Sequence, residues 1–580
     1  MENLIKLKID GIAVEVPQGS TILDAAQKAN ITIPTLCFLK KINAIGACRI
    51  CLVEVKNIRP LVAACVYPAS EGMEVFTHTA RVNQTRKMNL ELILSTHVKN
   101  CLSCERSTSC ELQKLCLEYG CDENRFGGAM PEKFIDNSSP ALARNSLKCI
   151  LCKRCKAACY ETQAVKVINV NRRGFESYLG CAYGSKINDT ACVGCGQCTL
   201  VCPTGALMEK SDIDKVLNAM ANPELVTVVA PAPSVRVGIA EEFGEPVGTN
   251  AEGRLATSLR MLGFKHVFDI DFAADLTIME EANELVERIK NKGVLPMMTS
   301  CSPGWVNYLT AYYPEMIPHL SSAKSPQQMF GATVKTYWAE KNKIDPKKIF
   351  VVTIMPCTAK KIEMLKHKDV NEGIQDIDAV LTVREYARLL KRQGINFNKL
   401  ADSKFDDPLG VSTGAGVIFG ATGGVMEAAL RTAADTLTGQ SLKEVDYKEV
   451  RGIKGIKEAT VDINGIKINV CAASGLANAK RVLESVKSGE KQYHFIEIMA
   501  CPGGCVNGGG MPLHNPNEIS FEMRAEARAK AIYQEDERKT IRKSHENPTI
   551  KMLYQEYFEK PGSHKAHHVL HNTFDPRKYI

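Results

Sequence analysis

The sequence lacks the features that mark membrane, secreted and nucleic-acid-binding proteins. Its longest apolar runs are no longer than strands, so no segment could cross a bilayer. The first six residues lack the basic segment followed by an apolar one that a secretory signal has, which favours a cytoplasmic location. The net charge of +8 over 580 residues is mild and forms no concentrated basic stripe, which argues against nucleic-acid binding.

A binding signature for nicotinamide or flavin is also missing. The chain has no glycine fingerprint of a dinucleotide-binding fold, so any nicotinamide chemistry would need another subunit. What remains is the composition of an ordinary soluble globular protein, with 45% apolar and 24% charged residues. The length leaves room for about four domains.

Cysteine is the exception to this ordinary composition, with 23 residues. In a short secreted chain such a number would indicate disulfides, but the length and the missing signal argue against that reading. The spacing of the cysteines along the chain instead indicates several separate sets of metal ligands.

Residues 1–80 predict a small ferredoxin-like domain. Two alternating segments, Leu4–Ile9 and Ile12–Val16, predict a hairpin, and Gly19–Ala29 has the pattern of a capped helix. The next four cysteines approximate the spacing of plant-type 2Fe-2S ferredoxins, although the first gap is longer. They are Cys37, Cys48, Cys51 and Cys65. A zinc site is the alternative, but the hairpin and helix favour a 2Fe-2S β-grasp domain.

Residues 81–125 contain one histidine and three cysteines in the order H-x3-C-x2-C-x5-C. They are His97, Cys101, Cys104 and Cys110. By itself this set suits zinc as well as iron, and a lone histidine is more often structural than a ligand. Cys116 and Cys121 follow closely, fit no ligand position and are predicted to be core thiols.

Residues 126–209 carry two copies of the bacterial ferredoxin run C-x2-C-x2-C-x3-C. In this motif the fourth cysteine ligates the other cluster. One predicted 4Fe-4S cluster therefore takes Cys149, Cys152, Cys155 and Cys202, and the other takes Cys192, Cys195, Cys198 and Cys159. This spacing is hard to explain without metal. Cys181 is left over between the two runs.

Residues 210–580 alternate between strand-like and helix-like segments, which predicts an α/β domain with mostly parallel sheets. The strand-like segments are Leu225–Ala230, Gly293–Pro296, Phe350–Ile354, Ala379–Leu381 and His494–Ile498. Beyond residue 512 the chain becomes polar, helical and basic, and we expect it to wrap over this domain.

Three of the strand-like runs end in thiols. The run Phe495–Met499 leads to Cys501 and Cys505 among five glycines, a second run ends at Cys357, and a third carries Cys301. Glycine lets the backbone come close to a bulky inorganic group, and ligands gather at the carboxyl ends of strands in α/β sheets. A C-x3-C pair alone could be two structural thiols, but three such strand ends predict a metal-cluster site.

The three segments resemble the signature motifs of the iron-only (FeFe) hydrogenases. The family patterns are T-S-C-C-P-x-W, M-P-C-x-x-K-x-x-E and E-x-M-A-C-x-x-G-C-x-x-G-G-G-x-P. They stand here at Thr299–Trp305, Met355–Glu363 and Glu497–Pro512. The second and third match at every fixed position. In the first, Ser302 replaces the family's second cysteine.

The resemblance covers nearly the whole chain and is to the large monomeric clostridial type with four accessory iron–sulfur clusters. It implies reversible reduction of protons to dihydrogen at an H-cluster. This centre is a 4Fe-4S cluster joined by a shared thiolate to a two-iron unit with carbonyl, cyanide and a bridging dithiolate amine. By position, Cys357, Cys501 and Cys505 would ligate it, with Cys505 as the shared thiolate.

The resemblance further implies a 4Fe-4S cluster on the His97 set and a catalytic domain of two α/β lobes across a cleft. The accessory clusters would carry electrons from a soluble ferredoxin or flavodoxin. Maturation proteins would be needed to build the H-cluster. The chain would act as a monomer.

The resemblance also assigns the surroundings of the centre. Lys360 would contact a cyanide ligand with Glu363 as its partner, and the pocket would include Met355, Met499, Pro231, Ser234 and Gln327. The proton route would map onto Cys301, Glu281, Ser321, Glu284 and Arg288. Without the motifs, the charged residues would be interpreted as solvated helix faces and the methionines as core. The i, i+3 spacing of the two glutamates does place both on one side of a helix.

Ser302 leaves three outcomes open. In the first, Ser302 binds the cluster through its oxygen. In the second, Cys301 becomes the ligand and gives up its part in the proton relay. In the third, the site is altered and catalytically weakened. Serine is a poor substitute, because its hydroxyl ionises with difficulty and its oxygen is a hard donor. The spacing from Cys357 favours Ser302 in the ligand position and Cys301 in the relay, since a shift by one residue along an extended segment points the thiolate away.

Two other functions stay open. One keeps the chemistry but makes the chain the catalytic subunit of an NADH-linked or electron-bifurcating complex. The other is a non-catalytic iron–sulfur sensor or assembly protein that has lost the two-iron unit. The intact second and third motifs and the full set of relay residues argue against the non-catalytic function.

Overall fold

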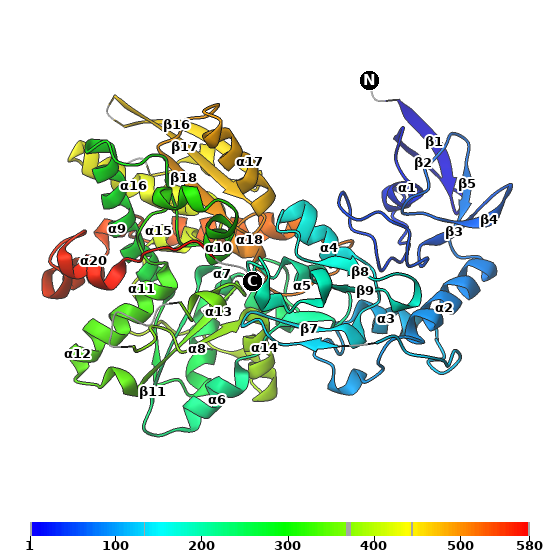
Figure 1. Cartoon of the computed structure of the whole chain (residues 1–580), viewed down its shortest axis with the longest axis horizontal. Helices are drawn as coiled ribbons and strands as arrows, with labels where there is room; N and C mark the ends of the chain where they lie inside the picture. Colours follow the sequence, from blue (N-terminus) through cyan, green and yellow to red (C-terminus); the bar gives the residue numbers. More distant parts are fainter. Residues whose placement is uncertain (1–2, 133, 367–372, 442–444, 464, 578–580) are drawn as a thin grey trace.

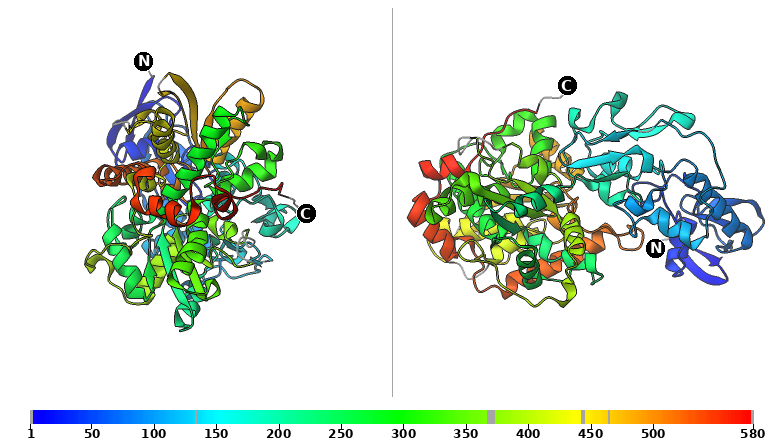
Figure 2. Two further views of the ribbon diagram at one scale, coloured as in Figure 1. Left: turned by 90° about the vertical axis from the view of Figure 1, so that its left-hand side faces the viewer. Right: turned by 90° about the horizontal axis from the view of Figure 1, so that it is seen from below.

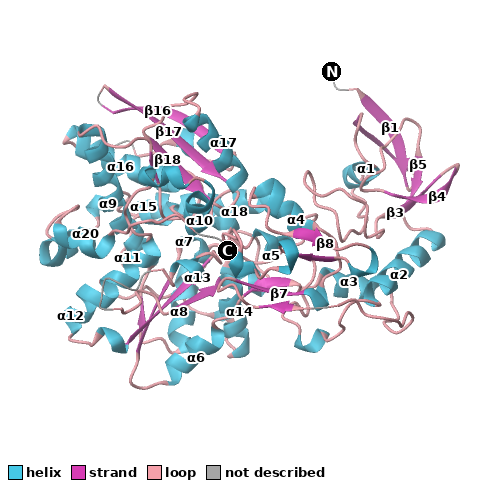
Figure 3. Cartoon of the chain, in the orientation of Figure 1, coloured by secondary structure: helices cyan, strands magenta, loops and turns pink. Residues whose placement is uncertain are grey.

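The computed structural model describes residues 3–132, 134–366, 373–441, 445–463 and 465–577, and these parts form five sheets with helices packed around them. The N-terminal modules extend from one side of a larger body that holds the rest of the chain (Figures 1 and 2). Strands are concentrated in the N-terminal module and in two sheets within the larger body (Figure 3). Among the described residues, no helix is both long and apolar enough to span a bilayer.

The first sheet confirms the predicted hairpin. Its order is β2 (Ile12–Pro17), β1 (Leu4–Ile9), β5 (Glu74–Phe76), β3 (Leu52–Val55) and β4 (Ile58–Ala63). β1 and β5 are parallel, and the other pairs are antiparallel. Asp10 and Gly11 connect the hairpin with φ of 47° and 84°, as a two-residue turn between twisted strands requires.

The helix predicted at Gly19–Ala29 is α1 (Ile22–Lys28). It begins later than the sequence pattern suggested, because Thr21 caps it. The Thr21 side chain accepts a hydrogen bond from the backbone N–H of Asp24, whose carboxylate bonds back to the Thr21 backbone.

The next segments are short and mostly irregular, since loops around cysteines dominate them. The helices are α2 (Ala80–Leu94), η1 (Cys101–Ser103), α3 (Glu111–Glu118), α4 (Arg154–Ala157), η3 (Ala158–Thr162) and α5 (Gln197–Val201). A three-stranded sheet has the order β10 (Leu207–Glu209), β7 (Leu142–Asn145), β6 (Ile135–Asp136), and β8 (Asn169–Asn171) pairs with β9 (Tyr178–Gly180).

Two sheets form the framework of the larger body. The first is fully parallel, with the order β12 (His266–Val267), β11 (Val226–Pro231), β14 (Ile349–Met355) and β15 (Ala379–Thr382). The second has the order β13 (Met297–Met298), β18 (Phe495–Met499), β17 (Ile466–Ser474) and β16 (Ile456–Ile463), antiparallel only between β16 and β17. The predicted strands at β11, β14, β15 and β18 are confirmed.

Two strand predictions need correction. The segment Gly293–Pro296 is not a strand; the strand β13 begins at Met297, since Pro296 has no N–H to donate to a sheet. The hairpin of β16 and β17 was not predicted at all, although it forms the edge of the second sheet.

Helices surround both sheets, and the longest of the central ones is α9 (Ile270–Lys290). It packs against α11 (Pro326–Thr333), α15 (Gly414–Ile418) and α16 (Gly424–Thr438). The other helices include α6 (Ile213–Ala221), α7 (Pro233–Arg236), α8 (Glu252–Leu262), α10 (Pro303–Tyr312), α12 (Ala339–Asn342), α13 (Lys360–Glu363), α14 (Val383–Arg392) and α17 (Leu476–Lys487).

The C-terminal part is helical, as predicted. It contains α18 (Phe521–Arg538), α19 (Pro548–Leu553), η15 (Tyr554–Phe558) and α20 (His564–Leu570). These elements cover the outside of the larger body, where α18 contacts α15 and α20 contacts α11 (Figure 1).

Candidate active site and cluster-binding loops

Strand ends from both central sheets bring thiols to one buried place. β14 ends at Met355, two residues before Cys357, and β18 ends at Met499, two residues before Cys501. Cys505 begins the turn η13 (Cys505–Asn507). Because parallel strands expose their carboxyl ends at one edge, the fold itself collects these side chains.

The three thiols face one another. Burial, followed by the neighbouring Cys357 thiol, raises the pKa of Cys505 to about 12. Burial and then the thiols of Cys357 and Cys195 raise the pKa of Cys501 well above its usual value. Thiols that are neighbours and shielded from water would repel each other if they ionised to thiolates, unless a bound metal compensates their charge.

Cys301 and Ser302 have different neighbours. The Ser302 hydroxyl oxygen accepts a hydrogen bond from the backbone N–H of Ala500 at 3.2 Å, directly beside Cys501. Cys301 is buried, and burial followed by the Glu281 carboxylate raises the pKa of its thiol well above the usual value, with a further contribution from the Cys505 thiol. Ser302 therefore lies beside the segment of Cys501, while Cys301 lies near both Glu281 and the Cys505 thiol.

Lys360 is the centre of a buried polar group. Its ammonium donates to the carbonyl oxygen of Cys301 at 3.1 Å, to the Ser325 hydroxyl at 2.8 Å and to Glu363 at 2.9 Å. Lys360 is only 8% exposed and Glu363 only 7%. The alternative of a solvated charged helix face is therefore wrong.

Ser325 and Gln327 complete this group. Both donate to the same Glu363 oxygen, at 2.9 Å and 3.1 Å. The sequence motifs did not point to Ser325. Its only sequence signal is that of a helix cap, a serine before Pro326 at the start of α11.

The other predicted pocket residues are buried. Met355 and Met499 lie in two different apolar clusters at the ends of their strands. Pro231 pairs with Ile354 in the first central sheet, one residue before Met355. Ser234 is fully buried, and its hydroxyl donates to the carbonyl oxygen of Gly420 at 3.4 Å.

The outer part of the predicted proton route is joined by hydrogen bonds between α9 and the loop that carries Ser321. The Ser321 hydroxyl donates to Glu284 at 3.0 Å, and Arg288 donates to the same carboxylate at 2.6 Å. Burial, followed by the Glu284 charge, raises the pKa of Glu281 to about 8, against a smaller opposing effect of Ser321. Neither carboxylate oxygen of Glu281 has a hydrogen-bond partner among the described residues, and the raised pKa favours its protonated form.

The two ferredoxin-like runs enclose one cavity, and all eight of their cysteines line it. The electrostatic neighbours of Cys155 are first Cys152, Cys149 and Cys202, and those of Cys198 are first Cys195, Cys192 and Cys159. The thiols therefore group as the two predicted ligand sets. Soft sulfur donors in a dry cavity suit iron–sulfur clusters.

In the N-terminal module the four predicted ligands lie together as two pairs. A hydrogen bond with the Cys37 thiol lowers the pKa of Cys48 to about 6, and one with the Cys51 thiol lowers the pKa of Cys65. Cys37 and Cys48 also act electrostatically on Cys65. The four sulfur atoms thus belong to one site.

The second module brings its cysteines to the ferredoxin-like module. The Cys110 thiol lies 3.6 Å from the carbonyl oxygen of Pro203, next to Cys202. Cys101 and Cys104 flank the turn η1, whereas His97 precedes it and stays a predicted ligand. Cys116 and Cys121 are half-buried and pack at the margin of a small apolar cluster, so they are less enclosed than predicted.

The loops of the ferredoxin-like module and the active site are in direct backbone contact. A Cβ atom on Gly509 would lie 2.3 Å from the carbonyl oxygen of Cys195. The Thr358 hydroxyl donates to the carbonyl oxygen of Gly194 at 2.6 Å. The loop that carries Cys195 therefore packs directly against the loops that carry Cys357 and Cys505.

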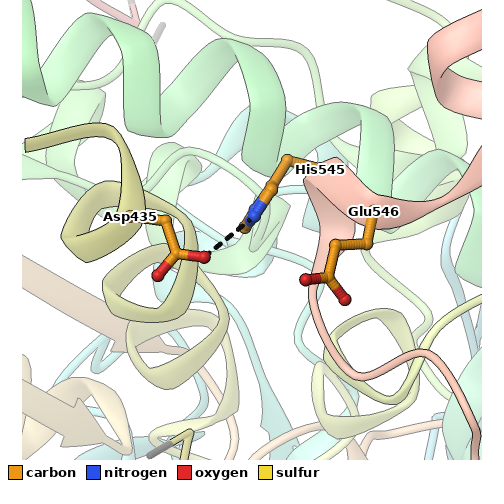
Figure 4. A group of neighbouring side chains, drawn as sticks. All are labelled: Asp435, His545 and Glu546. Atoms are coloured by element: carbon orange, nitrogen blue, oxygen red, sulfur yellow. Dashed lines mark hydrogen bonds and ion pairs between the residues drawn. The ribbon is translucent and has the colours of Figure 1, made fainter. Parts of the chain in front are cut away.

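A further group of metal-binding residue types lies elsewhere, between α16 and the C-terminal segment. It consists of Asp435, His545 and Glu546 (Figure 4). The Asp435 carboxylate already accepts from Lys543 at 2.6 Å and from His545 at 3.1 Å. Because a lysine ammonium occupies the carboxylate, we interpret this group as ion pairing that fixes the C-terminal segment.

Five family descriptions match successive parts of the chain. "Iron only hydrogenase large subunit, C-terminal domain" matches residues 225–509, and "Iron hydrogenase small subunit" matches residues 522–577. "2Fe-2S iron-sulfur cluster binding domain" matches residues 2–80, and "4Fe-4S dicluster domain" matches residues 148–206. Residues 86–125 match "NADH-ubiquinone oxidoreductase-G iron-sulfur binding region".

Individual proteins are similar over the whole length. The NADP-reducing hydrogenase subunit HndD of Solidesulfovibrio fructosivorans is 44% identical, with 100% of both chains covered. Iron hydrogenase 1 of Clostridium pasteurianum is 46% identical, covering 97% of this chain and 98% of its own. A solved structure of a variant of the apo FeFe-hydrogenase HydA1 of Chlamydomonas reinhardtii is 41% identical with a TM-score of 0.57, covering 63% of this chain and 99% of that one.

Proposed function

The chain belongs to the iron-only (FeFe) hydrogenase family and is a hydrogenase with accessory iron–sulfur clusters, and from this premise we propose that it reduces protons reversibly to dihydrogen with electrons from ferredoxin. One observation carries the proposal. Cys501 is buried and Cys357 and Cys505 are half-buried; the Lys360 ammonium acts electrostatically on Cys357 and Cys505, and the Cys505 thiol acts on Cys301.

The reaction centre is assigned to these three thiols, with Ser302 in the fourth ligand position and Cys505 as the thiolate shared with the two-iron unit. When bound, the H-cluster supplies the iron at which protons and electrons combine. The contact between Ser302 and the N–H of Ala500 supports the fourth position, because it holds the serine beside Cys501. An oxygen donor suits this sulfur site less well than a thiolate would.

The surrounding residues position the two-iron unit. Lys360 offers a compact cation to an anionic cyanide ligand, and Glu363 holds the ammonium in place. The buried side chains of the pocket exclude water and complete its walls. They are Met355, Met499, Pro231, Ser234 and Gln327.

Protons move between solvent and Cys301 along α9. Arg288 holds Glu284 near the surface, and the Ser321 hydroxyl lies between Glu284 and Glu281. The raised pKa of about 8 lets Glu281 be an acid at neutral pH. Cys301 would be the last side chain of the route to hold a proton before the bound H-cluster.

Electrons reach the centre through four accessory clusters. We assign residues 1–80 to a β-grasp 2Fe-2S domain, 81–125 to a His/Cys-ligated 4Fe-4S domain, 126–209 to a two-cluster ferredoxin domain, and 210–580 to a two-lobed catalytic domain with its helical wrap. Two observations support this order: the Cys195 thiol acts electrostatically on Cys501, and the Gly509 backbone lies against that of Cys195. Maturation proteins insert the two-iron unit, and the chain acts as a monomer.

A second candidate is a catalytic subunit in a nicotinamide-linked complex. The similarity to a subunit of an NADP-reducing hydrogenase raises it. Leu102, 103% exposed within η1, and Leu117, 83% exposed on α3, are single exposed leucines, which are normal on a protein surface and do not by themselves mark an interface.

Gas evolution from reduced viologen, after anaerobic maturation, tests the catalytic function. We expect dihydrogen and about twenty iron atoms per chain, because four accessory clusters and the centre are filled. About six iron atoms after careful anaerobic preparation would exclude the four-cluster path. Full activity of the isolated chain with reduced ferredoxin supports a chain that works alone, whereas activity that appears only when a nicotinamide-binding partner subunit is added supports the complex.

A further inference from the structure

The C-terminal segment pairs with the loop that carries the serines of the proton route. The backbone N–H of Lys324 donates to the carbonyl oxygen of Leu570 at 2.8 Å, and that of Asn572 donates to Ser322 at 2.7 Å. Ala323 and His571 form an isolated antiparallel bridge between these hydrogen bonds. The pairing places His571 beside Ser322 at the outer end of the route. Helix α20, which ends at Leu570 immediately before it, contacts α11 (Figure 1).

The His571 ring lies between a glutamate and a serine. Its Nε2 is 3.0 Å from the Glu280 carboxylate, and its Nδ1 is 2.8 Å from the Ser322 hydroxyl. Glu280 is buried and also accepts from Tyr554 and from the N–H of Gly562. A carboxylate in this position requires a proton on Nε2, so Nδ1 is the atom at which the ring gains or loses its second proton.

Ser322 connects the ring to the route. Its hydroxyl lies 3.1 Å from the Glu284 carboxylate oxygen, which also accepts its backbone N–H at 3.0 Å. A hydroxyl has one proton. Either Ser322 donates to Glu284 and accepts from Nδ1–H, or it donates to Nδ1 and accepts from protonated Glu284. The two patterns differ by one proton moved from His571 to Glu284.

We propose that His571 stores a proton for Glu284, delivered through Ser322; the proposal rests on the proton route given above. In the step, the Nδ1–H bond breaks and a new O–H bond forms on Ser322. The original hydroxyl proton of Ser322 moves to Glu284. Imidazolium becomes imidazole and carboxylate becomes carboxylic acid, with no change in electron count.

The array holds one transferable proton, which lies either on His571 or on Glu284. Dihydrogen takes two protons, so the second must reach Glu284 from solvent. The ring is 5% exposed and regains its proton from water between turnovers. The charged and titratable groups that face it are Glu280 and Glu284 from α9, Tyr554 from η15, and His567, whose ring is stacked on it at 4.2 Å.

His571→Gln tests the proposal, because glutamine can keep hydrogen bonds to Glu280 and Ser322 but cannot carry the proton. We expect dihydrogen evolution to fall about five- to tenfold at pH 6, with the infrared bands of the H-cluster unchanged. The carbonyl stretch of protonated Glu284, identified by its shift in D2O, should titrate at a different pH in the variant. His568→Gln, which changes an exposed histidine of α20 just before His571, is the matched control and should match the parent protein.

Ser322→Ala removes the connection but leaves the contact of His571 with Glu280. It should reproduce the fall in dihydrogen evolution. The double variant His571→Gln/Ser322→Ala should evolve no less dihydrogen than either single variant. Loss in Ser322→Ala with full activity in His571→Gln would overturn the proposal, as would an unchanged pH profile in both. If His571→Gln fails to fold, Ser322→Ala alone tests the proposal. The pH at which the carbonyl band of Glu284 titrates should then differ between Ser322→Ala and the parent protein.

Glu281→Gln separates this inference from the proposed route. If Glu281→Gln stops turnover while both His571→Gln and Ser322→Ala keep the parent pH profile, the route stands and only the proton store is wrong. If Glu281→Gln turns over normally, the route itself is wrong.

Discussion

The ammonium of Lys360 lies 3.1 Å from the carbonyl oxygen of Cys301, and this contact joins the segment after β13 to the helix that follows Cys357. The same ammonium is paired with Glu363 at 2.9 Å in a buried setting. Lys360 thus links the motif that contains Cys301 to the motif that contains Cys357, through a hydrogen bond to the backbone and through its charge.

Lys360→Met should destabilise the protein by about 3 to 5 kcal/mol, because it leaves the buried Glu363 charge without its cation. Adding Glu363→Gln should recover most of the stability but none of the activity, since the cation that faces the two-iron unit is still missing. Thermal unfolding and dihydrogen evolution of the two variants measure both effects. Recovery of activity in the double variant would contradict the role of Lys360.

Glu281→Gln should abolish turnover and change the pH dependence of stability. Because the pKa of Glu281 rises from 4.5 in an exposed setting to about 8 in the fold, its carboxyl group favours the folded state below pH 4.5. This contribution declines as pH rises toward about 8, by about 1.4 kcal/mol per pH unit. Glutamine does not titrate, so the stability of the variant should not show this decline with pH.

The Tm of Glu281→Gln minus the Tm of the parent protein should therefore increase from pH 5 to pH 8. An offset in Tm that is the same at both pH values would show that Glu281 is not protonated in the fold.

Ser302→Cys should raise the occupancy of the reaction-centre cubane, because it restores a soft donor beside Cys501. Cys301→Ala should abolish turnover yet leave the cubane assembled. Iron analysis and electron paramagnetic resonance of the reduced protein measure the cubane. Loss of the cubane in Cys301→Ala would mean that Cys301, and not Ser302, is the fourth ligand.

His97→Ala should perturb one accessory cluster and slow electron delivery while the infrared bands of the active centre stay in place. The paramagnetic resonance spectrum of the reduced protein identifies the affected cluster. An unchanged spectrum would assign His97 a purely structural role.

The cysteine sets could be predicted from the sequence because their spacing is local. A C-x2-C-x2-C run fixes the distances between thiols before any tertiary contact forms, and the cavity lined by all eight thiols agrees with it. The strands β14 and β18 were predictable for a similar reason, as continuous apolar runs are typical of buried parallel strands.

Ser325 and His571 could not be predicted, because only the tertiary fold places them. Ser325 meets Lys360 across 35 positions of sequence, and His571 meets Ser322 across 249. Neither residue belongs to a motif. The hairpin of β16 and β17 was missed because charged residues interrupt its apolar pattern, as an edge strand with one exposed face permits.

The close approach of Gly509 to Cys195 sets a limit on how fast electrons can tunnel into the centre. The two backbones touch only because position 509 carries no side chain, since a Cβ atom would lie 2.3 Å from a carbonyl oxygen. Tunnelling rates fall exponentially with separation. An alanine at this position would push the two loops apart and slow the last transfer, although it alters no ligand, no charge and no proton donor.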